Sequence, residues 1–173
     1  MAFSLYDATV ANYLQILDAA VSFLDKSLTY FRENGIDPLE VVEARLAPDM
    51  LPFRFQIVSV AQHSRGAMEA AKNGVFVPPS AKPDLDYAAL QALLTEARND
   101  LLALTPEAVN VLVGRDVTFK VGDRALPFTV ESFLMSFSLP NFFFHATTAY
   151  DILRQKGAPL GKRDFIGKLK LKG

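Results

Sequence analysis

Apolar residues recur at alternating spacings of three and four along four long stretches of the chain, a pattern typical of helices that bury one face. The first stretch begins at Ser4, whose spacing to Asp7 matches a helix-starting capping box. Asn34 and Gly35 supply the left-handed residue that ends such a helix. We therefore predict one long helix with the seam Val10, Leu14, Leu17, Val21, Leu24, Leu28 and Phe31.

A second seam, of smaller apolar residues, follows a turn that contains two prolines. We expect Asp49, in this turn, to cap the helix, and Asn73-Gly74 to end it. Small residues let a neighbouring helix approach closely. Before the turn, Asp37 and Pro38 predict a short helix. The members of the second seam are Phe53, Ile57, Val60, Ala61, Ser64, Ala67, Met68 and Ala71.

The third seam begins after a connection, Val75 to Asp86, that contains three prolines. Apolar periodicity resumes directly afterwards, so we interpret this connection as a crossover within one domain. Asp84 or Asp86 can cap the third helix, and Thr105 then opens a last short turn. The third seam consists of Tyr87, Leu90, Leu94, Ala97, Leu101 and Leu104.

Between the third and fourth helices, the apolar period changes from that of a helix to that of a strand. Val117, Phe119 and Val121 alternate with polar residues before the two-residue turn Gly122-Asp123, which predicts a small β-hairpin. Pro127 suits an edge strand because proline cannot donate to a sheet.

The fourth helix is expected to open at Thr129 or Glu131 and to run to about Gln155, where Gly157 stops it, with a kink at Pro140. These elements predict an all-α fold: a four-helix bundle with a long crossover between helices 2 and 3 and a small β-hairpin before helix 4. At 173 residues, we expect a single domain over residues 1–173, of which 156–173 form a basic tail.

Charge and composition exclude several classes of function. The chain has no cysteine, which rules out disulfides, thiol nucleophiles and cysteine-based metal sites. Its net charge of −1 argues against a nucleic-acid partner, although the tail alone carries a net charge of +5. We interpret the tail as solvated or docked on the domain's own acidic surface.

Ser132 to Tyr150 contains no charged residue, but its serines, threonines, Asn141 and His145 favour a buried helix over a membrane span. The first residues lack the basic region of a secretory signal. We therefore expect a cytoplasmic protein without a membrane partner.

Histidine is the scarcest group with chemistry to offer, present only at His63 and His145. Both fall on predicted bundle helices, where ligands can converge in the core. A catalytic metal site normally needs three protein ligands, however, and the position four after His145 is Ala149. A third ligand would have to come from Asp49, Glu131, Asp151 or Asn141. The alternative is that each imidazole is hydrogen-bonded within the core.

Two further features of the fourth helix suggest either packing or binding. Tyr150 and Arg154 share one face, so the guanidinium can stack on the ring or form part of an anion clamp. Phe142, Phe143 and Phe144 cannot all face one way, because consecutive helical residues turn by about 100°. We expect separate neighbours to bury at least two of these rings.

Several segments together resemble a known family: Arg45 to Met50 with Gln56, Leu139 to Arg154, and Gly157 to Phe165. On these residues the chain is identified as a member of the uncharacterised family "domain of unknown function nineteen ninety-three", within the DinB/YfiT-like superfamily. The resemblance covers essentially the whole chain. It implies a four-helix bundle with a long crossover, often dimeric.

For function, the resemblance implies divalent-metal enzymes, some of which transfer small thiols, with one histidine on helix two and a His-x3-His pair on helix four. His63 can match the first and His145 one of the pair, while Ala149 or Asn141 takes the other place. The first hypothesis is therefore an uncharacterised homodimer with an inter-helix pocket near His63, Asn141, His145, Tyr150 and Arg154, and no assignable reaction. The alternative is a transferase that uses zinc, nickel or iron held by His63 and His145.

Overall fold

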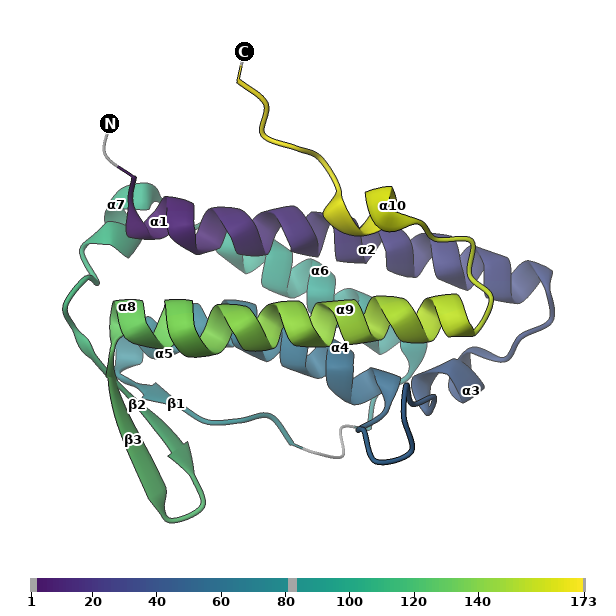
Figure 1. Ribbon diagram of the computed structural model, residues 1–173, viewed down its shortest axis with the longest axis horizontal. Helices are drawn as coiled ribbons and strands as arrows, with labels where there is room; N and C mark the ends of the chain where they lie inside the picture. Colours follow the sequence, from purple (N-terminus) through teal and green to yellow (C-terminus); the bar gives the residue numbers. More distant parts are fainter. Residues whose placement is uncertain (1–2, 81–83, 173) are drawn as a thin grey trace.

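Helices dominate the structure, a computed structural model that describes residues 3–80 and 84–172. Four long helical segments run side by side (Figure 1). The first segment is α2 (Val10–Glu33) and the third is α6 (Tyr87–Leu102). The second joins α4 (Phe53–Ala61) to α5 (Ala67–Asn73), and the fourth ends in α9 (Leu139–Gln155). Both α2 and α4 pack against α6 and α9, so the four segments enclose one core.

The first helix is interrupted near its start. Ser4 forms the predicted capping box with Asp7, but α1 (Leu5–Ala8) ends after one turn. Thr9, which is buried, has φ −123° and donates its hydroxyl to the carbonyl of Leu5 at 2.6 Å. This side-chain bond competes with the helical backbone pattern. The prediction of one unbroken helix is therefore wrong at Thr9.

The second and fourth segments each contain a π-helical turn, in which the backbone bonds span five residues instead of four. One turn, η1 (Gln62–Gly66), joins α4 to α5. The other, η2 (Phe133–Ser138), joins the short α8 (Val130–Ser132) to α9. Pro140, expected to kink the fourth helix, lies in the first turn of α9, immediately after η2.

Short elements connect these segments. Asp37 caps α3 (Pro38–Val42) as predicted, and Thr105 caps α7 (Pro106–Asn110). Asp86 caps α6, whereas Pro52 rather than Asp49 stands at the start of α4, without a side-chain cap. After α9, Gly157 adopts a left-handed φ of 93° and the chain turns back to α10 (Lys162–Ile166), which packs on α2.

The predicted hairpin is confirmed as β2 (Asp116–Val121) and β3 (Arg124–Thr129). A third strand, β1 (Val75–Phe76), pairs with β2 in parallel and was not predicted. The sheet order is β1-β2-β3, which leaves β3, with Pro127, at an edge. Figure 1 shows the hairpin extending away from the helices, at the end where α5 and α8 meet it. The crossover from α5 to α6 continues from β1.

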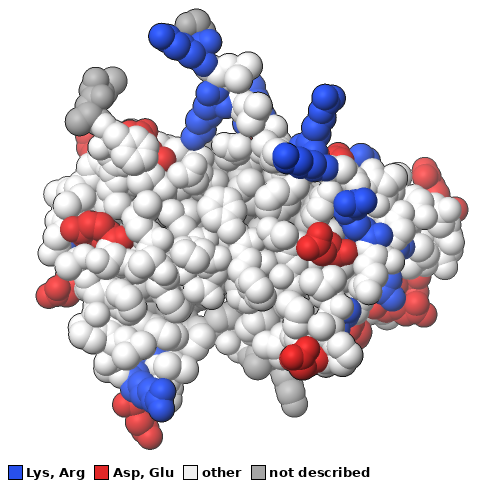
Figure 2. Space-filling view, viewed as in Figure 1, with Lys and Arg blue, Asp and Glu red and all other residues white. Residues whose placement is uncertain are grey.

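Along α9 the outward face is uncharged over several turns. Figure 2 shows that the centre of the face turned to the viewer, over α9, carries few charges. Of the three consecutive phenylalanines only Phe142 is fully buried; Phe143 and Phe144 are 39% and 56% exposed, so the expectation that two would be buried is wrong. None of the helices within residues 3–80 and 84–172 is long and apolar enough to span a membrane.

Candidate functional site

The two histidines, 82 positions apart in sequence, come together between the second and fourth helical segments. Their ring centroids are 5.9 Å apart and the ring planes differ by only 16°. His63 lies on the π-helical turn η1, and His145 lies in the middle of α9. The close packing of α4 and η1 against α9 brings them together, as the small residues of the second seam allow.

A chain of hydrogen bonds ties the two π-helical turns to each other beneath the histidines. The hydroxyl of Ser138, in η2, donates to the backbone carbonyl of His63 at 2.7 Å. Tyr13, in α2, donates in turn to the Ser138 hydroxyl at 3.1 Å. Burial raises the pKa of Tyr13, so the phenol keeps the proton that it donates. The backbone position of His63 is thus fixed by two other helices.

Gln56 fixes the orientation of the second imidazole. Its Oε1 lies 2.7 Å from Nδ1 of His145, and its Nε2 donates to the carbonyl of Leu51 at 2.7 Å. Because Nε2 must donate to a carbonyl, the amide oxygen faces His145, so Nδ1 of His145 is the nitrogen that carries the proton. Nε2 of the neutral ring therefore keeps a free lone pair.

Aromatic rings enclose both imidazoles. Phe76 and Phe137 lie 5.2 Å and 5.5 Å from the ring centroid of His63. Phe144 and Phe55 lie 5.2 Å and 5.8 Å from that of His145. An apolar enclosure of this kind penalises a charged imidazole.

Both histidines are accordingly neutral over the ordinary pH range. Burial, and then the charge that His145 would carry, lower the pKa of His63 to about 3. Burial lowers the pKa of His145 to about 4. A neutral imidazole has one donor and one acceptor nitrogen, so each ring can offer a lone pair to a ligand.

Nδ1 of His63 is buried and has no hydrogen-bond partner among the described residues. Buried polar atoms are almost always paired, with protein groups, water or a ligand. An unpaired one costs roughly 1–3 kcal/mol. This nitrogen is therefore a position where a small ligand or a water would be stabilised.

A divalent metal, which the family resemblance implies, does not fit this donor set. Only two imidazoles are present, with ring centroids 5.9 Å apart, whereas a catalytic site normally uses three protein ligands. Within the described ranges, no three His, Cys, Asp or Glu side chains are grouped so that they could hold one ion. Of the proposed third ligands, Glu131 instead accepts from the amide of Gly114 at 2.9 Å. Ala149, fully buried, offers no ligand atom.

The remaining candidate residues lie elsewhere on the fourth segment. Asn141 donates its side-chain amide to the carbonyl of Phe137, within its own helix, at 2.7 Å. The guanidinium of Arg154 lies 5.9 Å from the ring centroid of Tyr150, which matches the stacking interpretation. Tyr150 itself packs against Phe23, one helix away. The structure thus brings His63 and His145 together, while Tyr150 and Arg154 form a separate pair.

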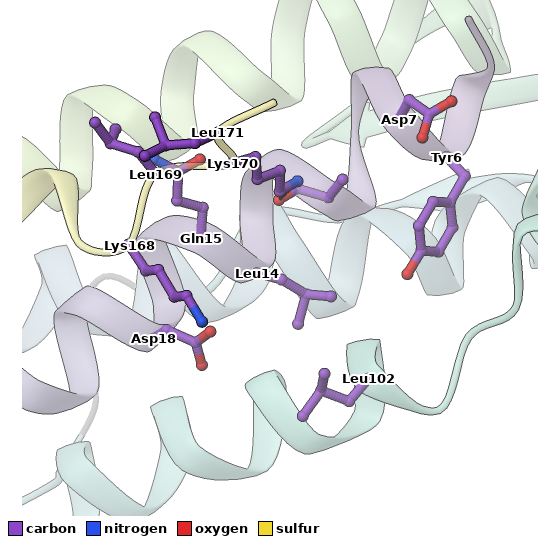
Figure 3. Close-up of a pocket in the computed structure, with 11 residues that line it drawn as sticks. Tyr6, Asp7, Leu14, Gln15, Asp18, Leu102, Lys168, Leu169, Lys170 and Leu171 are labelled. Carbon is purple, nitrogen blue, oxygen red and sulfur yellow. Dashed lines mark hydrogen bonds between the residues drawn. The ribbon is translucent and has the colours of Figure 1, made fainter. Parts of the chain in front are cut away.

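A surface hollow adjoins the imidazole pair. It has a volume of about 570 Å³ and lies between the connection before α4 and the outer face of α9. Phe144, whose ring contacts His145, forms part of its wall, together with Leu46, Met50 and Phe143. A larger groove of about 760 Å³ lies away from the histidines, between α2 and the C-terminal tail (Figure 3).

Only weak signals in the sequence pointed to the positioning residues Gln56 and Ser138. Gln56 and Ser138 are 2% and 0% exposed, yet they are polar residues within predicted apolar helices. A buried polar side chain must find a partner, so each could have been recognised as a position that supports a site.

Comparison with known proteins identifies the family of this chain. The family model described as "Domain of unknown function (DUF1993)" matches residues 5–166. The chain belongs to the DUF1993 family. A crystal structure of a DinB family member protein from Shewanella denitrificans is similar to it, with a TM-score of 0.78 and 22% sequence identity. That alignment covers 98% of this chain and 95% of the other, and at such low identity it shows the fold alone.

The membership of DUF1993 that the sequence indicated is thereby confirmed, and the fold is similar to that of a DinB family member. No curated protein matches this DUF1993 chain. Its function must be argued from its own residues.

Proposed function

We propose that this DUF1993 protein is a homodimeric four-helix bundle that binds a small neutral molecule at the His63–His145 pair and has no assignable reaction. The observation that supports the proposal is Nδ1 of His63, which is buried without a hydrogen-bond partner in the part of the chain that the structure describes, beside a second neutral imidazole. A ligand hydroxyl or thiol suits this position, because such a group both donates and accepts and so satisfies either tautomer.

The surroundings set the chemical class of the ligand. Four aromatic rings favour an apolar or aromatic body, since they stabilise a molecule that leaves water. The depressed pKa values of both histidines show that the enclosure disfavours charge. Phenols, short alcohols and aliphatic thiols are therefore the expected class, and carboxylates and ammonium ions are not.

Thermal unfolding with a ligand panel tests this proposal. A phenol, alcohol or thiol that binds only the folded state adds about 2.7 kcal/mol at a concentration of 100 Kd. For a protein of this size, that raises Tm by roughly 5–10 °C. His63→Phe removes the nitrogen that would hydrogen-bond the ligand, so it should abolish the shift. Arg154→Ala, outside the pair, is the matched control and should retain it.

Charged analogues of the same shape decide the ligand class. Equal Tm shifts with the matching carboxylate, or an undiminished shift in His63→Phe, would contradict the proposal. Metal analysis of untagged protein tests the alternative transferase. If the protein contained stoichiometric nickel, zinc or iron and lost it in His145→Ala, the metal-dependent transferase would be favoured over the proposed binding function.

A further inference from the structure

Ser59, in the middle of α4, carries a buried hydroxyl that the other described residues leave without a partner. The residue is 1% exposed, and its Oγ forms no hydrogen bond within the described part of the chain. Two other buried helical hydroxyls, those of Ser27 and Ser64, donate to the backbone carbonyl four positions earlier, each at 2.7 Å. Ser59 has the carbonyl of Phe55 at the same spacing but does not bond to it. Its hydroxyl is therefore free to bind another group.

Unpaired polar atoms are rare in this core. Among residues 3–80 and 84–172, the buried side-chain atoms without a partner are Oγ of Ser59, Nδ1 of His63 and Nε of Arg54. Another nitrogen of the Arg54 guanidinium pairs with Glu43 near the surface, so this group already has a partner. An unpaired buried atom is unfavourable, and most such atoms bind protein groups, water or a ligand. Ser59 and His63 thus both lack a polar partner in the core.

Helical spacing places Ser59 among residues that contact His145. Phe55 and Gln56 lie one turn before Ser59, and His63 lies one turn after it. Gln56 hydrogen-bonds to the ring of His145 at 2.7 Å. The rings of Phe55 and His63 have their centroids 5.8 Å and 5.9 Å from the centroid of that ring. Because residues three and four apart share a face of a helix, Ser59 also faces α9, within the histidine site.

We infer that Ser59 is a second polar contact of this site, and that a ligand hydroxyl is held between Oγ of Ser59 and Nδ1 of His63. The inference rests on the proposed function and narrows its ligand class. A hydroxyl donates one hydrogen bond and also accepts, so it satisfies both atoms in either tautomer of His63. It donates to Nδ1 and accepts from Ser59 when Nδ1 carries no proton, and the directions reverse when Nδ1 is protonated. A thiol is a weaker donor and acceptor, so the pair selects alcohols and phenols over thiols.

Two probes of nearly the same shape, benzyl alcohol and benzyl mercaptan, test this selection. Titration calorimetry of the full chain gives the dissociation constant of each. The quantity to compare is the Kd of the mercaptan divided by the Kd of the alcohol, because the different hydrophobicity of the probes affects this ratio equally in every variant. In Ser59→Ala the ratio should fall by about tenfold, since the alcohol loses a hydrogen bond that the thiol hardly forms. Ser27→Ala should leave the ratio unchanged. It is the matched control, because Ser27 is also buried in a helix but bonds to its own backbone.

Thermal unfolding without ligand tests whether a structural water already satisfies Ser59. Ser59→Ala removes an unpaired hydroxyl, so its Tm should equal or exceed that of the natural chain. A Tm that falls further than in Ser27→Ala would show that the hydroxyl is already paired in the free protein. That result would overturn the inference.

A crystal structure with benzyl alcohol tests the contact directly. The ligand oxygen should lie within about 3.2 Å of both Oγ of Ser59 and Nδ1 of His63. An oxygen beyond this distance from either atom would overturn the inference, as would an unchanged ratio in Ser59→Ala. If the ratio is unchanged but both probes lose binding in His63→Phe, the proposed function stands and only this inference fails. If neither probe binds the natural chain, the proposed function fails, and the inference that rests on it fails as well.

Discussion

At the scale of single residues, burial keeps both histidines neutral, but the two rings differ in their hydrogen bonds. Nδ1 of His145 donates a hydrogen bond to Oε1 of Gln56, whereas Nδ1 of His63 has no partner among the described residues. Both rings nevertheless lie within aromatic surroundings that disfavour the charged form. In mild acid the histidines of the folded state therefore bind fewer protons than those of the unfolded chain.

This difference predicts a loss of stability in mild acid. The folded-state pKa values of about 3 and about 4 lie below the value near 6.5 expected in the unfolded chain. Between these values only the unfolded state binds the protons, so the free energy of unfolding falls as pH falls. The slope is at most about 1.4 kcal/mol per pH unit for each histidine. Urea unfolding at pH 7, 6 and 5 measures it.

A variant with His63→Gln and His145→Gln is the control, because glutamine does not titrate. Its stability is lower at every pH, but its dependence on pH between 7 and 5 should be shallower than that of the natural chain. Carboxylates such as Glu131 and Asp164, whose pKa values are lowered by hydrogen bonds, titrate below this window. Parallel slopes in the two proteins would show that the histidines are protonated when folded.

At the scale of elements, the sequence predicted where helices start better than how they continue. Side-chain caps depend on one residue and its near neighbours. Ser4, Asp37 and Thr105 were predicted from spacing alone, and Asp86 and Thr129 were each one of two predicted candidates. The hairpin and the crossover were also predicted. The π-helical turns were not, because one extra residue in a turn barely alters an apolar seam. β1 was missed because a two-residue strand has no measurable period.

The candidate site was predicted only in part because its geometry depends on contacts between residues far apart in the sequence. His63 and His145 stood out as rare residues, and both belong to it. Their distance depends on the packing of η1 against α9, which no local pattern encodes. Gln56 and Ser138 act through partners far away in the sequence, so their roles became apparent only from the contacts.

The turn after α9 provides a test of backbone strain against side-chain crowding. Gly157 and Gly35 both have left-handed φ values, of 93° and 67°. Alanine at either position should cost roughly 1–2 kcal/mol for the backbone alone. A Cβ at Gly157 would also lie 3.0 Å from the hydroxyl of Tyr30, while at Gly35 nothing lies within 4 Å. Gly157→Ala should therefore destabilise the protein more than Gly35→Ala in urea unfolding.

Removing the Tyr30 hydroxyl separates the effect of side-chain crowding at Gly157 from that of backbone strain. In a Tyr30→Phe background the difference between the two alanine variants should shrink. An unchanged difference would mean that the closure of α9 toward α10 is strained for another reason.

At the scale of the whole molecule, four helical segments share one continuous core and the sheet extends it. Phe76 of β1 and Phe119 of β2 continue the aromatic packing from Phe137 outward to the hairpin. Tyr13 joins the opposite side, where its ring meets Phe142 edge-on at 4.9 Å. A core without internal boundaries is expected to unfold as one unit.

Substitutions in the phenylalanine run of α9 test whether the core unfolds as one unit. Phe142→Ala should lower the free energy of unfolding by about 3–5 kcal/mol, because the ring is fully buried. Phe144→Ala, at a ring that is 56% exposed, should cost less than about 1 kcal/mol. Helical circular dichroism and tyrosine fluorescence should give coincident transitions in both variants. Separate transitions would show that part of the molecule unfolds independently.

The paired π-helical turns also affect how this chain can be compared with its relatives. Each turn accommodates one residue more than an α-helix of the same length, as a one-residue insertion would. Deleting one residue from η1 would restore regular α-helix and leave the residues beyond it on the faces that they occupy now. A relative that lacks the insertion must therefore be aligned with a gap there. Without that gap, the residues of the relative that are aligned with His63 and with the positions after Ser138 would lie on a different face of their helix.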